Sequence, residues 1–228
     1  MKQNGNEILF YVCSDVHNHT SAFLKLLDTI DISNENVRLI VAGDLFDKGP
    51  GEDIMPLYEA TTHPHLIYLK GNHEAALGTY LISRYEQNRR VSYPFETPDT
   101  LAKHLSKDEL IGFGYQLMGL PLTFETKIGL RRFRIAHSNV PSRAKFGEAR
   151  DEDFYYKISG YKRQGLFTTV ITGHVPVGKM QNNSNSKIIW KNASRTVYNV
   201  DMGLGDIPSS HILGALELNS LREIYIEG

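Results

Sequence analysis

The chain has 228 residues, of which 41% are hydrophobic and 22% are charged, and its 25 basic and 26 acidic residues give a net charge of −1. This composition is typical of a folded globular protein, and the balanced charge argues against binding to nucleic acid or to an anionic membrane surface. No apolar run approaches the ~20 residues that a membrane span needs, and the single cysteine, Cys13, excludes an internal disulfide framework. Because the first residues also lack the apolar segment of a signal peptide, we expect one cytoplasmic domain covering residues 1–228.

The first 90 residues alternate between predicted strands and predicted helices. Apolar runs predict the strands, and apolar residues at helical spacing predict the helices between them. The predicted order is strand 7–13, helix 21–30, strand 37–43, helix 52–60, strand 65–71 and helix 74–87. This alternation favours parallel strands with helices covering the sheet.

The remainder of the chain has a different sequence pattern. A helix is predicted over 98–118, and short apolar segments then follow one another. These predict strands at 120–126, 131–137, 168–174, 186–192, 196–201, 212–218 and 222–228. We expect them to form a second sheet, much of it antiparallel, packed on the first.

Polar side chains recur at the point where a predicted strand ends. They are Asp15 and His17 after the first strand, Asp44, Asp47 and Lys48 after the second, Asn72 and His73 after the third, and His137 and His174 after two later strands. Ligands of open α/β sheets bind outside the carboxyl ends of the strands. Five strands are therefore predicted to deliver polar groups to one cleft.

The chemistry of this set favours a metal centre. Carboxylate, amide and imidazole ligands without a thiolate suit Mn²⁺, Fe²⁺, Zn²⁺ or Co²⁺. The set is larger than one tetrahedral zinc needs, so two ions that share a carboxylate fit better. Any one fragment alone is more typical of a helix cap or a core histidine, and it is the repetition over five strand ends that favours metal binding.

The fragments SDVHN, GDLFDKG, GNHE, AHS and TGH occur in this order along the chain. In this they resemble the phosphoprotein phosphatase (PPP) family of calcineurin-like metallophosphoesterases, most of all its small bacterial and phage serine/threonine protein phosphatases and diadenosine tetraphosphatases. The resemblance extends from about residue 8 to residue 205. It implies an α/β fold, a four-layer sandwich of two mixed β-sheets flanked by helices, with the site at the C-terminal strand ends.

The resemblance also implies roles for individual residues. It implies a dinuclear-metal phosphatase that hydrolyses phosphomonoesters by attack of a metal-bridging hydroxide, with a phosphoserine or phosphothreonine protein, or a small phosphoester, as substrate. Two divalent ions are implied, with manganese expected first and iron, zinc, cobalt or nickel also compatible. The implied metal ligands are Asp15, His17 and the bridging Asp44 at the first ion, and Asn72, His137 and His174 at the second. His73 is the implied general acid, and Asp47 is its implied partner.

Phosphate-binding residues are less clearly indicated. The resemblance points to Lys48, Lys70 and Asn72, with Arg143 as an additional cation. The family usually has arginine at the two lysine positions, and lysine keeps the charge while losing the planar bidentate fork. The first motif also has Ser14 and Asn18 where the family has glycine, and we expect the loop to persist because asparagine tolerates unusual turn angles.

Two other functions stay open on the sequence. The segment 153–165 around Tyr155 combines tyrosines with basic residues and favours a dinucleoside polyphosphate as an alternative substrate. A catalytically inactive metal- or phosphate-binding module is an alternative of another class. Glu74 is interpreted as structural, because a carboxylate near a helix start complements the helix dipole.

Overall fold

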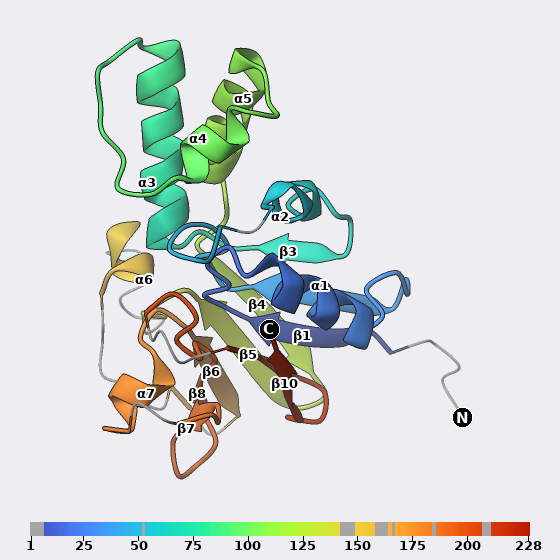
Figure 1. Cartoon of the computed structure of the whole chain (residues 1–228). Coiled ribbons are helices and arrows are strands. Elements are labelled where there is room, and N and C mark those ends of the chain that lie inside the picture. Colours follow the sequence, from blue (N-terminus) through green and yellow to red (C-terminus); the bar gives the residue numbers. More distant parts are fainter. Residues whose placement is uncertain are drawn as a thin grey trace.

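The computed structural model describes most of the chain, and its secondary structure is drawn in Figure 1. The described residues are 7–51, 53–141, 149–157, 164–165, 167–183, 186–206 and 211–228. Two five-stranded sheets form the body of the structure, and helices α3 and α5 project from it side by side (Figure 1).

The first sheet has the strand order β10-β9-β1-β2-β3. Its strands are β1 (Leu9–Cys13), β2 (Val37–Val41), β3 (Leu66–Tyr68), β9 (Ile212–Glu217) and β10 (Glu223–Glu227). Strands β1, β2 and β3 pair in parallel, whereas β9 pairs antiparallel with both β1 and β10. The prediction that β9 and β10 belong to the second sheet is therefore wrong. Every residue of β9 is buried, and such a continuous apolar run does not indicate which sheet it joins.

The second sheet has the order β4-β5-β6-β8-β7. Its strands are β4 (Thr123–Ile128), β5 (Arg131–Ala136), β6 (Thr168–Thr172), β7 (Trp190–Lys191) and β8 (Val197–Asn199). The outer pairs β4–β5 and β7–β8 are antiparallel, but β5–β6 and β6–β8 are parallel. The expected antiparallel character thus holds only at the two edges of this sheet.

The helices include the four that were predicted, of which the last is divided in two, and two short ones in the second half of the chain that were not predicted. They are α1 (Thr20–Thr29), α2 (Met55–Ala60), α3 (Asn72–Leu81) with the π-helical turn η1 (Ile82–Glu86), α4 (Thr97–Leu101), α5 (Lys107–Met118), α6 (Glu152–Tyr155) and α7 (Val177–Met180). The single helix predicted over 98–118 is two helices, because Ser106 and Glu109 form a capping box that starts α5. Among the described residues, no helix combines the length and apolar character that a membrane crossing requires.

Three apolar clusters define the layers. Tyr11 and Cys13 of β1 face a cluster shared with the helices, including Phe23 of α1, whereas Val12 faces a cluster that includes Phe133 of the second sheet. A third cluster around Phe154 of α6 covers the opposite face of the second sheet. The order helices, sheet, sheet, helix confirms the α/β sandwich of two mixed sheets.

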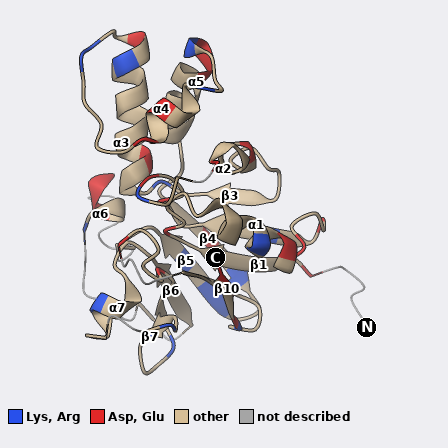
Figure 2. Cartoon of the chain, in the orientation of Figure 1, with Lys and Arg blue, Asp and Glu red and all other residues tan. Residues whose placement is uncertain are grey.

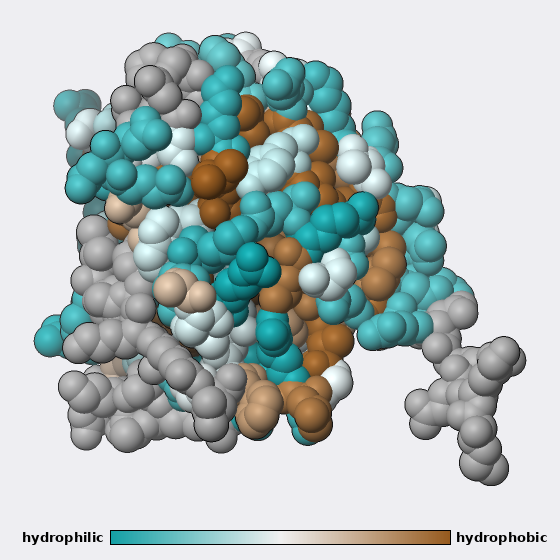
Figure 3. Space-filling view, turned by 90° about the horizontal axis from the view of Figure 1, so that it is seen from below, coloured by the Kyte–Doolittle hydropathy of each residue, from teal (hydrophilic) through white to brown (hydrophobic). Residues whose placement is uncertain are grey.

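The surface has no dominant charge or apolar face in the views drawn. Basic and acidic residues are spread over helices and strands (Figure 2), in keeping with the balanced composition. Hydrophobic residues seen from below are interrupted by hydrophilic ones (Figure 3). The basic strand β5 is not an exposed cationic patch, because Arg134 is buried and its Nε donates to Glu125.

Candidate metal centre

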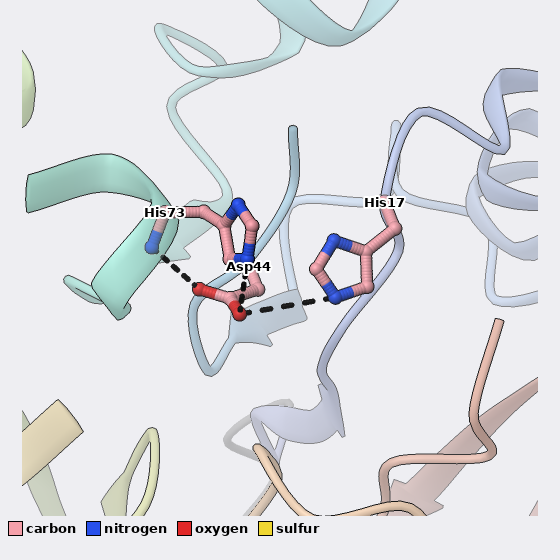
Figure 4. A group of neighbouring side chains, drawn as sticks. All are labelled: His17, Asp44 and His73. Atoms are coloured by element: carbon pink, nitrogen blue, oxygen red, sulfur yellow. Dashed lines mark hydrogen bonds and ion pairs between the residues drawn. The ribbon is translucent and has the colours of Figure 1, made fainter. Parts of the chain in front are cut away.

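Asp44 lies at the centre of the polar cluster. It lies in the loop after β2, and its Oδ2 lies 3.8 Å from Nε2 of His17, which is in the loop after β1. The same oxygen lies 3.9 Å from Nε2 of His73 in the first turn of α3, and Figure 4 shows both rings turned toward this carboxylate. All three side chains are buried. Residues that are far apart in sequence thus present nitrogen and oxygen atoms to one small volume.

A second group shares the same carboxylate. Nε2 of His137, after β5, lies 3.3 Å from Asp44 Oδ2 and 3.1 Å from Nδ1 of His174, after β6. The amide oxygen of Asn72 lies 3.0 Å from the same His137 nitrogen. Within each group, His17–Asp44–His73 and Asp44–His137–His174, the candidate ligand atoms lie within 4.8 Å of one another. The two groups are joined through Asp44, as a pair of ions with one shared ligand requires.

Backbone carbonyls orient two of these imidazoles. Nδ1 of His17 lies 3.1 Å from the carbonyl oxygen of Phe46, and Nδ1 of His137 lies 2.8 Å from that of Ala42. A carbonyl only accepts, so each Nδ1 carries the proton and donates it. Nε2 of each ring then faces the carboxylates, and it is the nitrogen left for a metal ion to bind.

Asp15 belongs to the same cluster. Its Oδ1 lies 3.7 Å from Nε2 of His17, while its Oδ2 accepts the backbone N–H of His174 at 2.9 Å and the Ser14 hydroxyl. One carboxylate thus ties the loop after β1 to the loop after β6. All six predicted metal ligands are brought together at one end of the two sheets.

The electrostatics of the cluster are dominated by Asp44. Burial alone would raise its pKa, but the neighbouring imidazoles, His137 first, hold that pKa well below its usual range. Burial opposes protonation of His137, yet the charges of Asp44 and Asp15 raise its pKa to about 10. Burial lowers the pKa of His17 and of His174, so both rings are neutral near pH 7 and available as ligands.

His73 forms a pair with Asp47. Its Nδ1 lies 2.9 Å from Oδ2 of Asp47, which is fully buried, and its Nε2 faces Asp44. Burial alone would lower the pKa of His73, but the hydrogen bond to Asp47 and the charge of Asp44 raise it. The arrangement favours an imidazolium with one N–H held by Asp47 and the other directed toward the metal centre.

The loops that carry these residues have strained backbones. Seven non-glycine residues of the site have a positive φ: Asp15, His17, Asn18, Asp44, Asp47, Lys48 and His174. Such angles cost free energy and cluster at functional sites. Asn18 indeed replaces the family's glycine in a left-handed conformation, with φ of 59°. Gly173 is required for another reason, since a Cβ there would overlap Asp15 and Ser14.

Glu74 has a larger structural role than its position in the helix predicted. Its buried carboxylate accepts the backbone N–H groups of Asp44, Leu45 and Gly71 at 2.7–2.9 Å, and the Tyr68 hydroxyl at 2.6 Å. It therefore fixes the backbone on which Asp44 is carried. The sequence signals only a helix start here, because these partners are set by tertiary contact.

The predicted phosphate-binding cations are placed differently from one another. The Lys48 ammonium lies near the site, where its charge acts on His17, His73 and His174, and it pairs with Asp206 at 3.1 Å. Lys70 is buried, and its ammonium donates to the carbonyl of Met118 at the end of α5. Arg143 lies outside the described residues.

The fold and this cluster together define a metallophosphoesterase. The family model for calcineurin-like phosphoesterases matches residues 8–203, so the chain belongs to that family and is a metal-dependent phosphoesterase. The comparison with curated proteins found no match.

Solved structures share the fold at low identity. A candidate diadenosine tetraphosphatase matches with a TM-score of 0.64 at 15% identity, covering 99% of this chain and 95% of that one. A cold-active protein-tyrosine phosphatase of a psychrophilic Shewanella species has a TM-score of 0.56 at 15% identity, with coverages of 97% and 81%. A serine/threonine phosphatase of Saccharomyces cerevisiae has a TM-score of 0.56 at 14% identity, with coverages of 99% and 82%. At such identities the likeness extends to the fold alone.

Proposed function

We propose that this protein is a two-metal phosphatase that hydrolyses phosphomonoesters, with phosphoserine or phosphothreonine in proteins as its substrate class. The observation that carries the proposal is that Asp44 lies between His17, with Asp15 beside it, and the group of His137 and His174. A second support is the buried His73–Asp47 pair beside them. Metal sites that serve only structure have no need of an adjacent proton donor.

The residues fit a pair of divalent ions. Asp15, His17 and Asp44 would hold one ion, and Asp44, Asn72, His137 and His174 would hold the other. Two such ions, of which manganese is our first choice, would activate water at neutral pH and neutralise charge on the phosphoryl group. The mixed nitrogen and oxygen donors, and the two imidazoles oriented by carbonyl groups, support this assignment.

His73 is the proposed general acid. Its Nδ1–H is held by Asp47, so the proton at Nε2 is the one that can be given to the leaving oxygen. The raised pKa of His73 extends the protonated form of the ring to higher pH, and a general acid must be protonated before it acts. Asp47 would keep the ring in this orientation and stabilise its positive charge.

Phosphate would be bound by cations and an amide at the mouth of the centre. Lys48 is the better placed of the two lysines, although it must share its ammonium with Asp206. Lys70 would have to leave the Met118 carbonyl in order to contact phosphate. Asn72 and Arg143 complete the proposed set, and both assignments remain predictions.

The structure gives less support to the alternative substrate, a dinucleoside polyphosphate. The dinucleoside polyphosphate hypothesis rests on the aromatic residues around Tyr155, but among the described residues of this segment Phe154 and Tyr155 are buried, whereas Tyr156 is exposed. Phe95 is a different aromatic neighbour of the site, with its ring 5.2 Å from that of His73. This contact keeps a substrate with an aromatic leaving group in consideration.

The proposal is tested by assaying purified protein with manganese against p-nitrophenyl phosphate, a phosphoserine peptide and diadenosine tetraphosphate. We expect hydrolysis of the first two and, on the phosphoserine peptide with its poor leaving group, a kcat at least ~100-fold lower for His73→Gln, the usual contribution of a general acid. The exposed His104→Gln is the control and should match the wild type. Preferred turnover of the dinucleotide would support the alternative substrate, and bound metal without turnover of any phosphoester would indicate an inactive module.

A further inference from the structure

Besides the hydrogen bond from His73, the Asp47 carboxylate accepts a second one that the sequence did not predict. The same Oδ2 that lies 2.9 Å from His73 Nδ1 accepts the hydroxyl of Tyr93 at 2.6 Å. Tyr93 must be the donor, because an ionised carboxylate only accepts hydrogen bonds. Tyr93, Asp47 and His73 thus form one continuous hydrogen-bonded chain that ends at the metal centre.

The segment that carries Tyr93 folds back from the far end of the helical projection. Residues 87–96 leave η1, run back alongside α3 and enter α4 (Figure 1). The Tyr93 ring packs on Tyr80 of α3 with a centroid distance of 5.0 Å, and the Phe95 ring lies 5.8 Å from Tyr93 and 5.2 Å from His73. Two aromatic side chains of this segment therefore cover the His73–Asp47 pair.

Thr97, the first residue of α4 after this segment, is linked to Asp47 by polar contacts. The Thr97 hydroxyl accepts the side-chain amide of Asn18 at 3.2 Å, and the amide oxygen of Asn18 accepts the backbone N–H of Asp47 at 3.1 Å. The segment thus reaches Asp47 both directly through Tyr93 and indirectly through Asn18.

The carboxylate has few other restraints. Oδ1 of Asp47 is buried and has no hydrogen-bond partner among the described residues. The orientation of the group therefore depends on the two donors at Oδ2. Without the Tyr93 hydroxyl, the carboxylate could rotate and offer either oxygen to His73, and the imidazole would lose its fixed direction.

We propose that Tyr93 is a positioning residue that holds Asp47 in the orientation in which His73 delivers its proton. The inference rests on the proposed function, in which the oxygen of a water molecule bonds to phosphorus while the P–O bond to the leaving oxygen breaks. The Nε2–H bond of His73 breaks in the same step, as its proton moves to that leaving oxygen. Tyr93 keeps its own proton throughout. Phe95 shields the pair from water, which strengthens both hydrogen bonds at Asp47.

Tyr93→Phe removes only the hydroxyl, and Tyr80→Phe is its matched control on the ring packed against it. For both variants, kcat and KM are measured with manganese on a series of aryl phosphates. The pKa of the leaving group increases along the series. Protonation of the leaving oxygen matters most for poor leaving groups, so kcat of Tyr93→Phe on phenyl phosphate should fall about 10-fold. Its kcat on p-nitrophenyl phosphate should fall much less, KM should be unchanged, and Tyr80→Phe should match the wild type.

An equal loss for all leaving groups, or no loss, would overturn the inference. If the wild-type protein hydrolysed no phosphoester, the proposed function would fail, but the positioning role would still be tested by histidine nitrogen NMR. The ring signals of His73, assigned through His73→Gln, should move in Tyr93→Phe and stay in place in Tyr80→Phe. Unchanged signals in Tyr93→Phe would refute the contact between the segment and the pair.

Discussion

Asp44 is the side chain on which most of the site depends. Its Oδ2 lies within 3.3–3.9 Å of Nε2 of His17, His73 and His137, and its Oδ1 accepts the backbone N–H of His73. Burial lowers the pKa of His137, and the charge of Asp44 is the largest of the effects that raise it. No other carboxylate among the described residues belongs to both ligand groups.

Asp44→Asn should therefore remove both ions rather than one. The substitution replaces an anionic ligand by a neutral amide of similar size, and neither group keeps its shared charge. Metal content measured after dialysis against manganese should fall from two ions per chain to fewer than one. The exposed Asp28→Asn should retain both ions. Two ions in Asp44→Asn would contradict the bridging role.

The second prediction at this scale concerns pH. The pKa of His73 is raised above its ordinary value of 6.5, because the Asp47 hydrogen bond and the Asp44 charge outweigh the effect of burial. The imidazolium exists below the pKa, so a raised pKa extends the acid form to higher pH. The alkaline limb of kcat should therefore lie above pH 6.5, and Asp47→Asn should move it to lower pH. An unmoved limb in a pH–rate profile would show that another group is the acid.

At the scale of elements, the loops that follow the strands determine the geometry of the metal centre. Glu74 joins α3 to the loop after β2 through the backbone N–H groups of Asp44 and Leu45. The N–H of Gly71 and the Tyr68 hydroxyl at the end of β3 are two further donors to the same carboxylate. A single helix start thus fixes the orientation of the chain that carries Asp44.

Glu74→Gln should destabilise the protein markedly. Its amide has only one acceptor oxygen and would direct an NH₂ group at backbone donors, leaving buried groups unpaired. We expect the free energy of unfolding in urea to fall by about 2–4 kcal/mol. Glu86→Gln is a suitable control, because Glu86 is exposed and accepts a hydrogen bond from the exposed Tyr115 hydroxyl. Equal stability of the two variants would contradict the role given to Glu74.

The sequence predicted those parts of the structure that depend on local pattern. The strand-end motifs identified the residues from Asp15 to His174 that converge, because parallel strands carry their ends to one edge. The sheet to which β9 belongs was not predictable, since its apolar run can pair with either sheet. Tyr93 was missed because it reaches Asp47 only when residues 87–96 fold back along α3. Its sole signal is a tyrosine in a polar segment, which is common on surfaces.

At the scale of the whole molecule, the site lies where the two sheets meet, and its buried charged groups destabilise the fold. Asp15, Asp44 and Asp201 are all buried at the edge where the sheets meet. Burial and then the charge of Asp15 raise the pKa of Asp201 well above its usual range, a sign of repulsion that bound cations would relieve. Metal binding and folding should therefore be coupled.

Manganese should accordingly raise the melting temperature of the protein. A ligand at about 100 times its dissociation constant stabilises the folded state by about 2.7 kcal/mol, or roughly 5–10 °C for a chain of this size. Thermal unfolding with manganese and with a chelator measures the difference. Asp44→Asn should show no such shift, and a wild-type protein insensitive to manganese would contradict the coupling.

The most direct measurement is anomalous diffraction from crystals grown with manganese. We predict two peaks about 3.5–4 Å apart with the Asp44 carboxylate between them. Asp15 and His17 should contact one peak, and Asn72, His137 and His174 the other. A single peak, or two peaks that Asp44 does not join, would contradict the two-metal account.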